Sequence, residues 1–270
     1  MVNKDTHLCI SVASHPSNFG TTLHNAAYTA LSLNFVYKAF GISDLAGALT
    51  GVRALNIRGC SVSMPFKEAV LPLLDELDET ARVIGAVNTV VNEAGTLKGY
   101  NTDAVGASKA LEAIKAQPGE SVLLMGSGGV ARAIVFALRQ LGFSQVWVAN
   151  RDLKKVQLLN SILPCEVVPW DERHKIGADL FINATSIGMS PDVQRSPIEA
   201  KFLRQTRAVM DVVVSPMETR LIREARSLGL EVAPGHLMSL EQAIAQFRLY
   251  TGVVPPRALL ESKIRELQAQ

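Results

Sequence analysis

The stretch VLLMGSGGVARA, Val122–Ala133, decides the fold of this 270-residue chain. Its first four residues are apolar and lead directly into Gly126, Gly128 and Gly129, after which a helical pattern begins. Glycines between a strand and a helix let backbone N–H groups approach a pyrophosphate, which the positive end of the helix also attracts. Ordinary turns contain glycines too, but here the strand, the glycines, the helix and the next strand arrive in order. The stretch therefore predicts a dinucleotide-binding site.

Strand and helix patterns alternate regularly on the C-terminal side of this stretch. Helical patterns, two of which end at Gly142 and Gly229, separate the strands. Strands that alternate with helices are typical of a doubly wound parallel sheet of the Rossmann type. The strand-like runs are QVWVAN (145–150), CEVVPW (165–170), ADLFINAT (178–185), AVMDVVV (208–214) and LEVAPG (230–235).

The first hundred residues show shorter strands and helices, which predict a second α/β domain with a parallel or mixed sheet. The strand-like runs are LCISVA (8–13), FVYKAF (35–40) and IRGCSVS (57–63). Ser43 or Asp44 is placed to cap a helix that follows the second of them. A chain of this length is consistent with two domains.

Composition and charge exclude several classes of function. The formal net charge is +2, from 27 basic and 25 acidic residues, and only 6% of residues are aromatic, so we expect no nucleic-acid partner and no membrane partner. Cys9, Cys60 and Cys165 lie far apart without a CxxC or Cys/His pairing, which predicts a cytoplasmic protein with no metal site. The N-terminus lacks a signal-peptide pattern, and no apolar run is long enough to span a membrane. We expect a monomer or a homodimer.

The strand end at VWVANRDLKK is where a Rossmann domain meets the adenosine ribose. A carboxylate there bonds the ribose hydroxyls of NAD, whereas a neutral residue followed by arginine suits the 2′-phosphate of NADP. Asn150 and Arg151, with Lys154 or Lys155, favour NADP. Asp152 works against it because a carboxylate beside a phosphate costs free energy, so NAD remains possible.

Three polar residues lie in apolar surroundings and form a candidate reaction centre. Lys67 follows Pro65 in SVSMPFK, Asn88 lies in GAVNTVV, and Asp103 lies in GYNTDAVG. Oxidation of a hydroxyl by hydride transfer also requires removal of the hydroxyl proton, and a lysine paired with a carboxylate can remove it. Lys67 and Asp103 are therefore the candidate acid/base pair.

Taken together, the motifs of the chain resemble those of the shikimate dehydrogenase family over nearly its full length. The matching motifs are SMPFK (63–67), GAVNT (85–89), NTD (101–103), GSGGVARA (126–133), NR (150–151), NATSIGM (183–189), DVVVSPMETRLI (211–222) and GHLMSLEQA (235–243). The resemblance implies two domains: a substrate domain at residues 1–102, completed by C-terminal helices at 238–270, and an NADP-binding Rossmann domain at 103–237.

The resemblance also implies roles for individual residues. Lys67 matches the catalytic lysine and Asp103 matches its aspartate partner. The expected substrate-binding residues are Asn18, Gly20, Thr21, Ser63, Asn88 and Gln242. The expected cofactor-binding residues are Gly126, Ser127, Gly128, Gly129, Val130, Ala131, Asn150, Arg151, Lys155, Thr185, Ser186, Val212 and Met238.

The loop SHPSNFGTTLHN, residues 14–25, departs from the family pattern. The two serines that hold the substrate carboxylate in the family fall on Asn18 and Gly20, and Thr21 or Thr22 is placed to cap the following helix. The loss of a hydroxyl that bonds a carboxylate costs ~1.5–3 kcal/mol, so we expect weak activity on shikimate. Val214, Leu237 and Asp152 also replace usual family residues. The altered loop is similar to that of a shikimate dehydrogenase-like branch of the family.

The resemblance implies an NADP-dependent oxidoreductase that interconverts shikimate, or a close cyclic hydroxy-acid such as quinate or an analogue, and its 3-dehydro ketone. That reaction belongs to the chorismate pathway of aromatic amino acid biosynthesis, although the sequence leaves quinate use open. One alternative is a non-catalytic NADP- or metabolite-sensing protein on the same scaffold. A second alternative is a Rossmann dehydrogenase with unrelated chemistry, such as the folate-type enzymes, and the combination of SMPFK, NTD and Gln242 argues against it.

Overall fold

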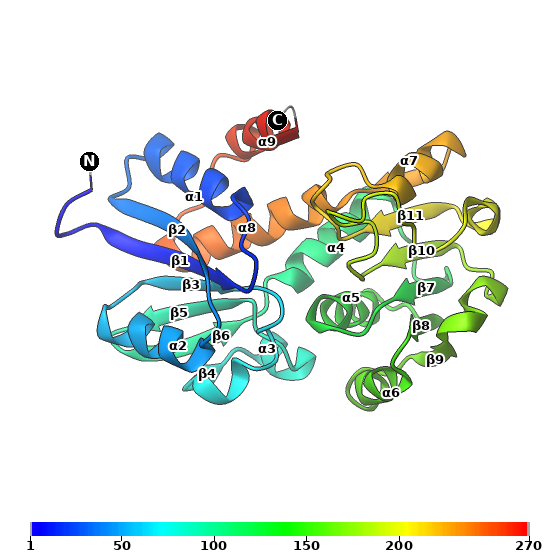
Figure 1. Ribbon diagram of the computed structural model, residues 1–270, viewed down its shortest axis with the longest axis horizontal. Helices are drawn as coiled ribbons and strands as arrows, with labels where there is room; N and C mark the ends of the chain where they lie inside the picture. The colour runs from blue at the N-terminus through cyan, green and yellow to red at the C-terminus, as the bar shows by residue number, and fades with distance from the viewer. Residues whose placement is uncertain (1, 269–270) are drawn as a thin grey trace. The chain divides into compact units, whose positions relative to one another are not determined.

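A computed structural model of the chain describes residues 2–268. The chain divides into two compact units: residues 1–102 together with 242–270, and residues 103–241. Each unit is built around one six-stranded sheet. The structure therefore has the expected α/β class, with two sheets along one chain (Figure 1).

The sheet of the first unit is mixed and has the strand order β2-β1-β3-β5-β6-β4. β1 is parallel to β2 and β3, whereas β5 is antiparallel to β3 and β6 (Figure 1). The strands are β1 (His7–Ala13), β2 (Phe35–Gly41), β3 (Gly59–Val62), β4 (Glu76–Leu77), β5 (Thr89–Glu93) and β6 (Thr96–Tyr100). The helices are α1 (Phe19–Ala30), α2 (Leu45–Ala54), η1 (Leu71–Leu73), α3 (Glu79–Ile84) and α9 (Arg257–Gln268), and the boundary between the units falls inside α8 (Gly235–Thr251).

Two helix starts in this unit test the expected caps. Asp44 caps α2, because its carboxylate accepts a hydrogen bond from the N–H of Gly47 at 2.9 Å. The expectation that Thr21 or Thr22 caps α1 is wrong: the helix begins at Phe19 and its N-cap is Asn18. The first helical bond runs from the N–H of Thr22 to the carbonyl of Asn18, so both threonines already lie inside the first turn.

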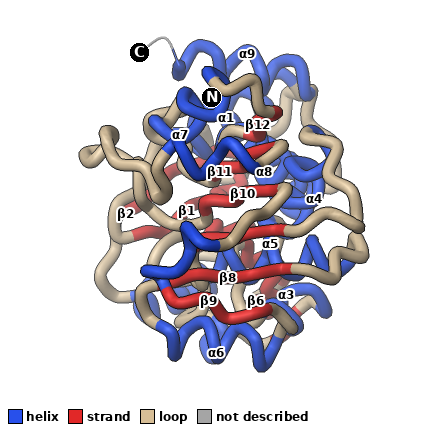
Figure 2. The backbone as a smooth tube through the Cα atoms, turned by 90° about the vertical axis from the view of Figure 1, so that its right-hand side faces the viewer, coloured by secondary structure: helices blue, strands red, loops and turns tan. Residues whose placement is uncertain are grey.

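The sheet of the second unit is all-parallel, with the order β12-β11-β10-β7-β8-β9. Figure 2 shows β12, β11, β10, β8 and β9 in that order from top to bottom, and β7 lies between β10 and β8. The strands are β7 (Val122–Met125), β8 (Val146–Asn150), β9 (Glu166–Pro169), β10 (Leu180–Asn183), β11 (Ala208–Asp211) and β12 (Glu231–Ala233). The helical segments are α4 (Asp103–Ala113), α5 (Gly129–Gln140), α6 (Leu153–Ile162), η2 (Trp170–Lys175), η3 (Ala200–Gln205), α7 (Arg220–Ser227) and the start of α8.

Alternate residues of the central strands pack into two different apolar clusters. Leu124 of β7 and Ile182 of β10 belong to one cluster, whereas Leu123 and Phe181 belong to the other. Successive side chains of a strand point to opposite faces of the sheet, so both faces are covered. This explains why the strands appear in the sequence as continuous apolar runs.

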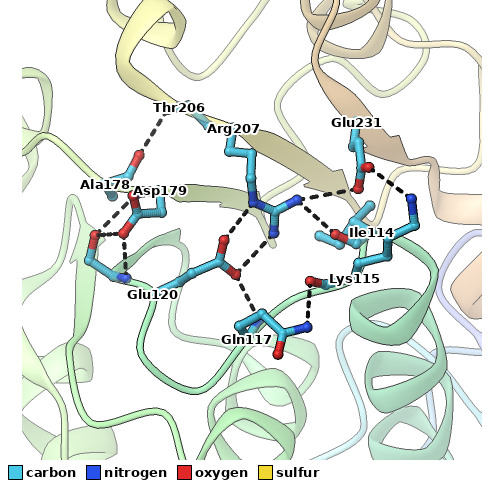
Figure 3. Close-up of polar contacts among 10 residues, drawn as sticks. Ile114, Lys115, Gln117, Glu120, Ala178, Asp179, Thr206, Arg207 and Glu231 are labelled. Carbon is cyan, nitrogen blue, oxygen red and sulfur yellow. Dashed lines mark hydrogen bonds and ion pairs between the residues drawn. The ribbon is translucent and has the colours of Figure 1, made fainter.

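Polar contacts close the amino-terminal edge of this sheet (Figure 3). The guanidinium of Arg207 donates to Glu120 Oε2 at 2.9 Å, to Glu231 Oε2 at 3.2 Å and to the carbonyl of Ile114 at 2.9 Å. Beside it, the N–H and hydroxyl of Ser121 donate to Asp179 Oδ2 at 2.8 and 2.7 Å. These bonds tie together the segments that lead into β7, β10, β11 and β12.

None of the helices within residues 2–268 is long and apolar enough to cross a membrane. Over the same part of the chain, no three His, Cys, Asp or Glu side chains gather as metal ligands would.

Candidate active site

Two loops of the first unit meet at the carboxyl ends of β1 and β3. The N–H of Ser63 donates to the carbonyl of Val12 at 2.9 Å, and the N–H of Ser14 donates to the carbonyl of Met64 at 3.2 Å. Both strands are parallel, so the segments that follow them emerge at the same edge of the sheet. The structure thus brings the expected substrate residue Ser63 beside the loop that leads to α1.

The start of α1 carries three of the expected substrate residues in different environments. The Asn18 side chain is exposed and makes no cap bond. Gly20 lies against the Tyr37 ring: a Cβ at this position would be 3.3 Å from the phenol oxygen. The hydroxyl of Thr21 is buried, with no hydrogen-bond partner among the described residues. A buried polar group without a partner costs free energy, so this hydroxyl is suited to a ligand or a bound water.

Asn88 is held at the start of β5 by the segments around it. Its carbonyl accepts from the N–H of Val62 at 2.8 Å. Its side-chain Oδ1 accepts from the N–H of Thr102 and from the hydroxyl of Thr89, both at 2.8 Å. Oδ1 of Asn88 is therefore engaged within the protein, which fixes the orientation of the amide group.

Gln246 of α8 joins the hydrogen-bond network around Asn88, and it is a residue that the sequence did not single out. It is only 2% exposed. Its Nε2 lies 2.8 Å from Thr89 Oγ1, 3.0 Å from Ser61 Oγ and 3.2 Å from the carbonyl of Asn88. Gln242, the expected substrate residue, lies one helical turn earlier and so shares this face of α8. A second glutamine at i+4 was the signal that could have revealed Gln246.

His24 and four aromatic rings pack beside this network. The imidazole of His24 stacks on Tyr37 with a centroid distance of 4.5 Å and an interplanar angle of 4°. It also lies 5.9 Å from the ring centroid of Phe247 in α8. Burial lowers the pKa of His24 to about 4, against the opposing effect of Gln246. His24 is therefore neutral near pH 7 and acts here as an aromatic packing residue.

The candidate acid/base residues lie in different units. Lys67 is half-buried, and its carbonyl accepts from the N–H of Val87 at 2.8 Å, which fixes its loop beside the segment that leads to Asn88. Asp103 is 5% exposed and opens α4, where a carboxylate also interacts favourably with the helix dipole. Lys67 belongs to the first unit and Asp103 to the second, so their pairing stays a prediction.

The glycine turn of the second unit has the geometry that a phosphate cradle needs. Gly126 has a φ of +110°, and a Cβ there would lie 2.7 Å from the carbonyl oxygen of Ala184, so no other residue fits without a shift. Gly128 is exposed at the N-cap of α5, and no side chain caps this helix. The first N–H groups of α5 are therefore suited to an anion. The expected residues Ser127, Gly129, Val130 and Ala131 complete this turn.

The end of β8 combines a link to this turn with a helix cap. Asn150 Nδ2 donates to the hydroxyl of Ser127 at 2.8 Å. Asp152 caps α6, since its Oδ1 accepts from the N–H groups of Lys154 and Lys155 at 3.1 and 3.4 Å. The side chains of Arg151 and Lys155 are exposed. Asp152 thus has a structural role that its sequence position alone did not reveal.

The remaining expected cofactor residues follow β10 and β11 or lie at the start of α8. Thr185 is half-buried and Ser186 is exposed in the loop after β10, and Val212 follows the last residue of β11. Met238 is 5% exposed and packs against α4, because a Cβ at Gly106 would lie 2.5 Å from its carbonyl oxygen. A contact between Met238 and the nicotinamide stays a prediction.

The chain is similar in sequence and fold to several known proteins. Residues 18–90 match the family described as the shikimate dehydrogenase substrate binding domain. The chain is 41% identical to the shikimate dehydrogenase-like protein of Haemophilus influenzae, over 96% of each chain. It is similar to the structure of shikimate 5-dehydrogenase from Thermus thermophilus in complex with NADP(H) and shikimate, with a TM-score of 0.86, 36% identity and coverage of 96% of this chain and 99% of that one. It is also similar to quinate dehydrogenase from Corynebacterium glutamicum in complex with NAD, with a TM-score of 0.88, 31% identity and coverage of 97% and 99%.

Proposed function

Because the chain belongs to the shikimate dehydrogenase family of NAD(P)-dependent oxidoreductases, we propose that it interconverts shikimate, or a close cyclic hydroxy-acid such as quinate, and the 3-dehydro ketone. The observation that carries the proposal is the joining of the loops after β1 and β3 with Asn88 in the first unit. This unit would bind the substrate, and the second unit, with its glycine turn, would bind NADP.

The proposed reaction needs one proton acceptor and one hydride acceptor. Lys67, in its neutral form, takes the proton from the substrate hydroxyl as the C–O bond becomes C=O. Asp103 stabilises the lysinium that forms. NADP, when bound, supplies the acceptor for the hydride and its two electrons. In the reverse direction Lys67 returns the proton to the carbonyl oxygen, so atoms and charges balance.

Substrate positioning is proposed for the polar groups at the carboxyl ends of the strands. Ser63, Asn88 and Gln242 would bind the ring hydroxyls, and the start of α1 would bind the carboxylate. Gly20 supplies only its backbone there. The hydroxyl groups that would lie near the carboxylate are those of Thr21 and of the neighbouring Tyr37. Turnover of shikimate is therefore proposed to be weak.

We propose NADP rather than NAD as the cofactor because of the charged side chains near the end of β8. Arg151 and Lys155 are exposed cations beside the end of β8. The carboxylate of Asp152 is partly compensated, because it accepts two backbone N–H groups of α6. Replacement of Asp152 by serine keeps a cap and removes the charge, so Asp152→Ser should raise the ratio of kcat/KM for NADP over NAD about tenfold. An unchanged ratio would show that Asp152 does not face the adenosine phosphate.

The experiment that tests the function is a cofactor-reduction assay. Shikimate, quinate and aminated analogues are each incubated with NADP and with NAD, and absorbance at the nicotinamide band is followed. The proposal predicts NADPH formation with shikimate or quinate. Absence of cofactor reduction across the whole panel would refute it.

A non-catalytic sensor is the second candidate, favoured by the missing side chain at Gly20 and the exposed Asn18. A sensor would show a rise in melting temperature with shikimate or quinate but no NADPH.

The cytoplasmic location and the monomeric or homodimeric state remain predictions. All three cysteines are free and buried, which agrees with a reducing compartment.

A further inference from the structure

Three polar side chains are almost completely buried at the carboxyl ends of β10 and β11. Asn183 and Asp211 are 0% exposed, and Thr219, the N-cap of α7, is 1% exposed. The proposed reaction does not use any of them. Polar side chains at such depth require hydrogen-bond partners, so each one constrains the segments that supply those partners.

Asp211 is the centre of this group. Its Oδ1 accepts from Asn183 Nδ2 at 3.0 Å and from the N–H of Val213 at 3.1 Å, and its Oδ2 accepts from the hydroxyl of Thr219 at 2.6 Å. Burial raises the pKa of Asp211 to about 6, while these hydrogen bonds act in the opposite direction. Every partner is a donor, so the ionised carboxylate is the form that satisfies all three contacts.

On one side, Asp211 fixes the loop after β10 through Asn183. Asn183 Oδ1 accepts from the hydroxyl of Thr185 at 2.6 Å and from its N–H at 3.1 Å. Asn183 Nδ2 also lies 3.2 Å from the carbonyl of Ile187, whose own N–H donates to the hydroxyl of Thr185 at 3.1 Å. The loop is thus wrapped around one amide group, and Asp211 sets the orientation of that amide.

This loop in turn lies against the glycine turn. A Cβ at Gly126 would be 2.7 Å from the carbonyl oxygen of Ala184 and 3.3 Å from Thr185 Cγ2. The space beside Gly126 is thus too small even for a methyl group, and the N–H of Ala184 donates to the carbonyl of Met125 at 2.8 Å, so the loop and the turn are in direct contact. A displacement of Thr185 would therefore displace the backbone proposed to hold the pyrophosphate.

On the other side, Asp211 fixes the loop after β11. β11 ends at Asp211, although the apolar run AVMDVVV continues for three more residues. The strand stops there because the N–H of Val213 donates to the side chain of Asp211. The hydroxyl of Thr219 donates to Asp211 and accepts from the N–H of Ile222 at 3.3 Å, so it anchors the far end of the loop at α7. Gly235 packs on the same loop, since a Cβ there would be 2.2 Å from the carbonyl oxygen of Val213.

We propose that Asp211 is a positioning residue of the dinucleotide site, which holds the loop after β10 against the glycine turn and the loop after β11 against α7. The residue touches neither substrate nor cofactor and acts through Asn183, Thr185 and Thr219. This inference rests on the proposed function, because only that function assigns the glycine turn to a dinucleotide.

Thr219 supplies the cleanest variants for a test. Thr219→Val keeps the shape but removes both the donor to Asp211 and the helix cap, whereas Thr219→Ser retains both bonds. Thr206→Val is the matched control, because Thr206 is also buried and its hydroxyl donates to the carbonyl of Ala178 at 3.1 Å at the amino-terminal edge of the same sheet. Asp211→Asn, which replaces one acceptor oxygen by an NH2 group that faces donors, is a second variant of the network.

Two measurements are made on each full-length variant: NADPH affinity by fluorescence, and amide hydrogen exchange of segments 184–189 and 212–219 without cofactor. We expect Thr219→Val to bind NADPH about tenfold more weakly and to exchange faster in both segments. Thr219→Ser and Thr206→Val should match the parent in both measurements. The KM for the hydroxy-acid should change less than the NADPH affinity.

The outcomes separate this inference from the proposed function. If the parent binds neither NADPH nor NADH, the proposed function fails, and the exchange data still decide whether Asp211 positions the two loops. If the parent binds NADPH and folded Thr219→Val binds it as tightly as Thr206→Val does, the positioning role is overturned. Unchanged exchange in segment 184–189 of both Thr219→Val and Asp211→Asn overturns it as well.

Discussion

The two ends of the parallel sheet in the second unit are built in opposite ways. At the amino-terminal edge, Arg207 joins Glu120 and Glu231, and Ser121 bonds Asp179 (Figure 3). At the carboxyl-terminal edge, the strands lead into the glycine turn, Asn150 and the loops that follow β10 and β11. The expected cofactor residues that follow β7, β8, β10 and β11 lie at this second edge.

The difference follows from the direction of the strands. In a parallel sheet the helices that follow the strands begin at the carboxyl edge, so their N–H groups and positive dipole ends gather there. An anion is favoured at that edge, whereas the opposite edge is available for contacts that only stabilise the fold. Chemistry and stability should therefore be separable by mutation.

The largest effect is expected at Asp103, which opens α4 at the start of the second unit. Asp103→Asn keeps the size of the side chain and removes the charge that is proposed to stabilise protonated Lys67. We expect kcat to fall about a hundredfold or more, with the free energy of unfolding changed by no more than about 1 kcal/mol. Steady-state kinetics and urea denaturation measure the two quantities. A kcat equal to that of the parent would remove Asp103 from the mechanism.

At the amino-terminal edge we expect a loss of stability without a loss of turnover. Arg207→Met leaves the carboxylate of Glu120 without its cation and leaves Glu231 paired with Lys115 alone. The free energy of unfolding at pH 7 should therefore fall by about 2 kcal/mol. The kcat and both KM values should be unchanged. A drop in kcat in the folded variant would break the separation between the two edges.

The pH dependence of the Arg207→Met effect can be predicted from Glu120. Partial burial raises the pKa of Glu120, but the hydrogen bonds from Arg207 and from the N–H of Gln117, together with the charge of Arg207, outweigh it and bring the pKa below its usual value. A lowered carboxyl pKa contributes stability above the unfolded-state pKa of 4.5, and this contribution is lost as the pH falls through the folded-state pKa. The stability difference between parent and Arg207→Met should therefore shrink as the pH is lowered below 4.5. A difference that grows on acidification would contradict this assignment.

A smaller effect is expected from Gln246, which extends the comparison to the first unit. Gln246→Leu removes the donor that joins Ser61, Thr89 and the carbonyl of Asn88. The KM for the hydroxy-acid should rise about tenfold, since Asn88 loses part of its support, while the KM for NADP should stay constant. Equal changes in both KM values would indicate a general loss of structure.

The smallest effect is expected at Gly20. Gly20→Ser restores a hydroxyl at the start of α1, but its Cβ would be 3.3 Å from the Tyr37 oxygen, so the ring must shift slightly. We expect the KM for shikimate to fall up to about tenfold, because a hydroxyl can again donate to the carboxylate. If KM is unchanged or rises, this part of α1 does not face the carboxylate.

The sequence was most informative where local patterns decide the structure. The Rossmann sheet followed from apolar runs that alternate with helices, and the Asp44 cap followed from the residues next to its helix. The start of α1 was missed by a few residues, because Asn18, Thr21 and Thr22 are all common cap residues. In the second unit, Asp211 contacts Asn183, 28 residues away, and no local pattern reports such a contact.

For the candidate site, too, the sequence revealed the local features and missed those that depend on distant contacts. The glycine turn was recognisable because its residues are consecutive, and the structure supplies the reason for Gly126 in its contact with Ala184. The support that Gln246 and Asp211 give to the site was invisible, because it depends on helices and loops that meet only in the folded units. The cap formed by Asp152 is a local pattern, but Asp152 also lies beside the residues expected to bind the cofactor, and that position drew attention away from the cap.

We propose that the loops at the carboxyl ends of the strands carry the chemistry, with Lys67 as the acid/base. The most direct test of this claim is the rate of NADPH formation from shikimate or quinate, whichever the parent oxidises, for Lys67→Ala and for Lys98→Ala, a control at a partly exposed lysine of β6. We predict a loss of at least about a hundredfold in kcat for Lys67→Ala and no loss for Lys98→Ala, with both variants as stable as the parent. Turnover by Lys67→Ala equal to that of the parent would contradict the claim.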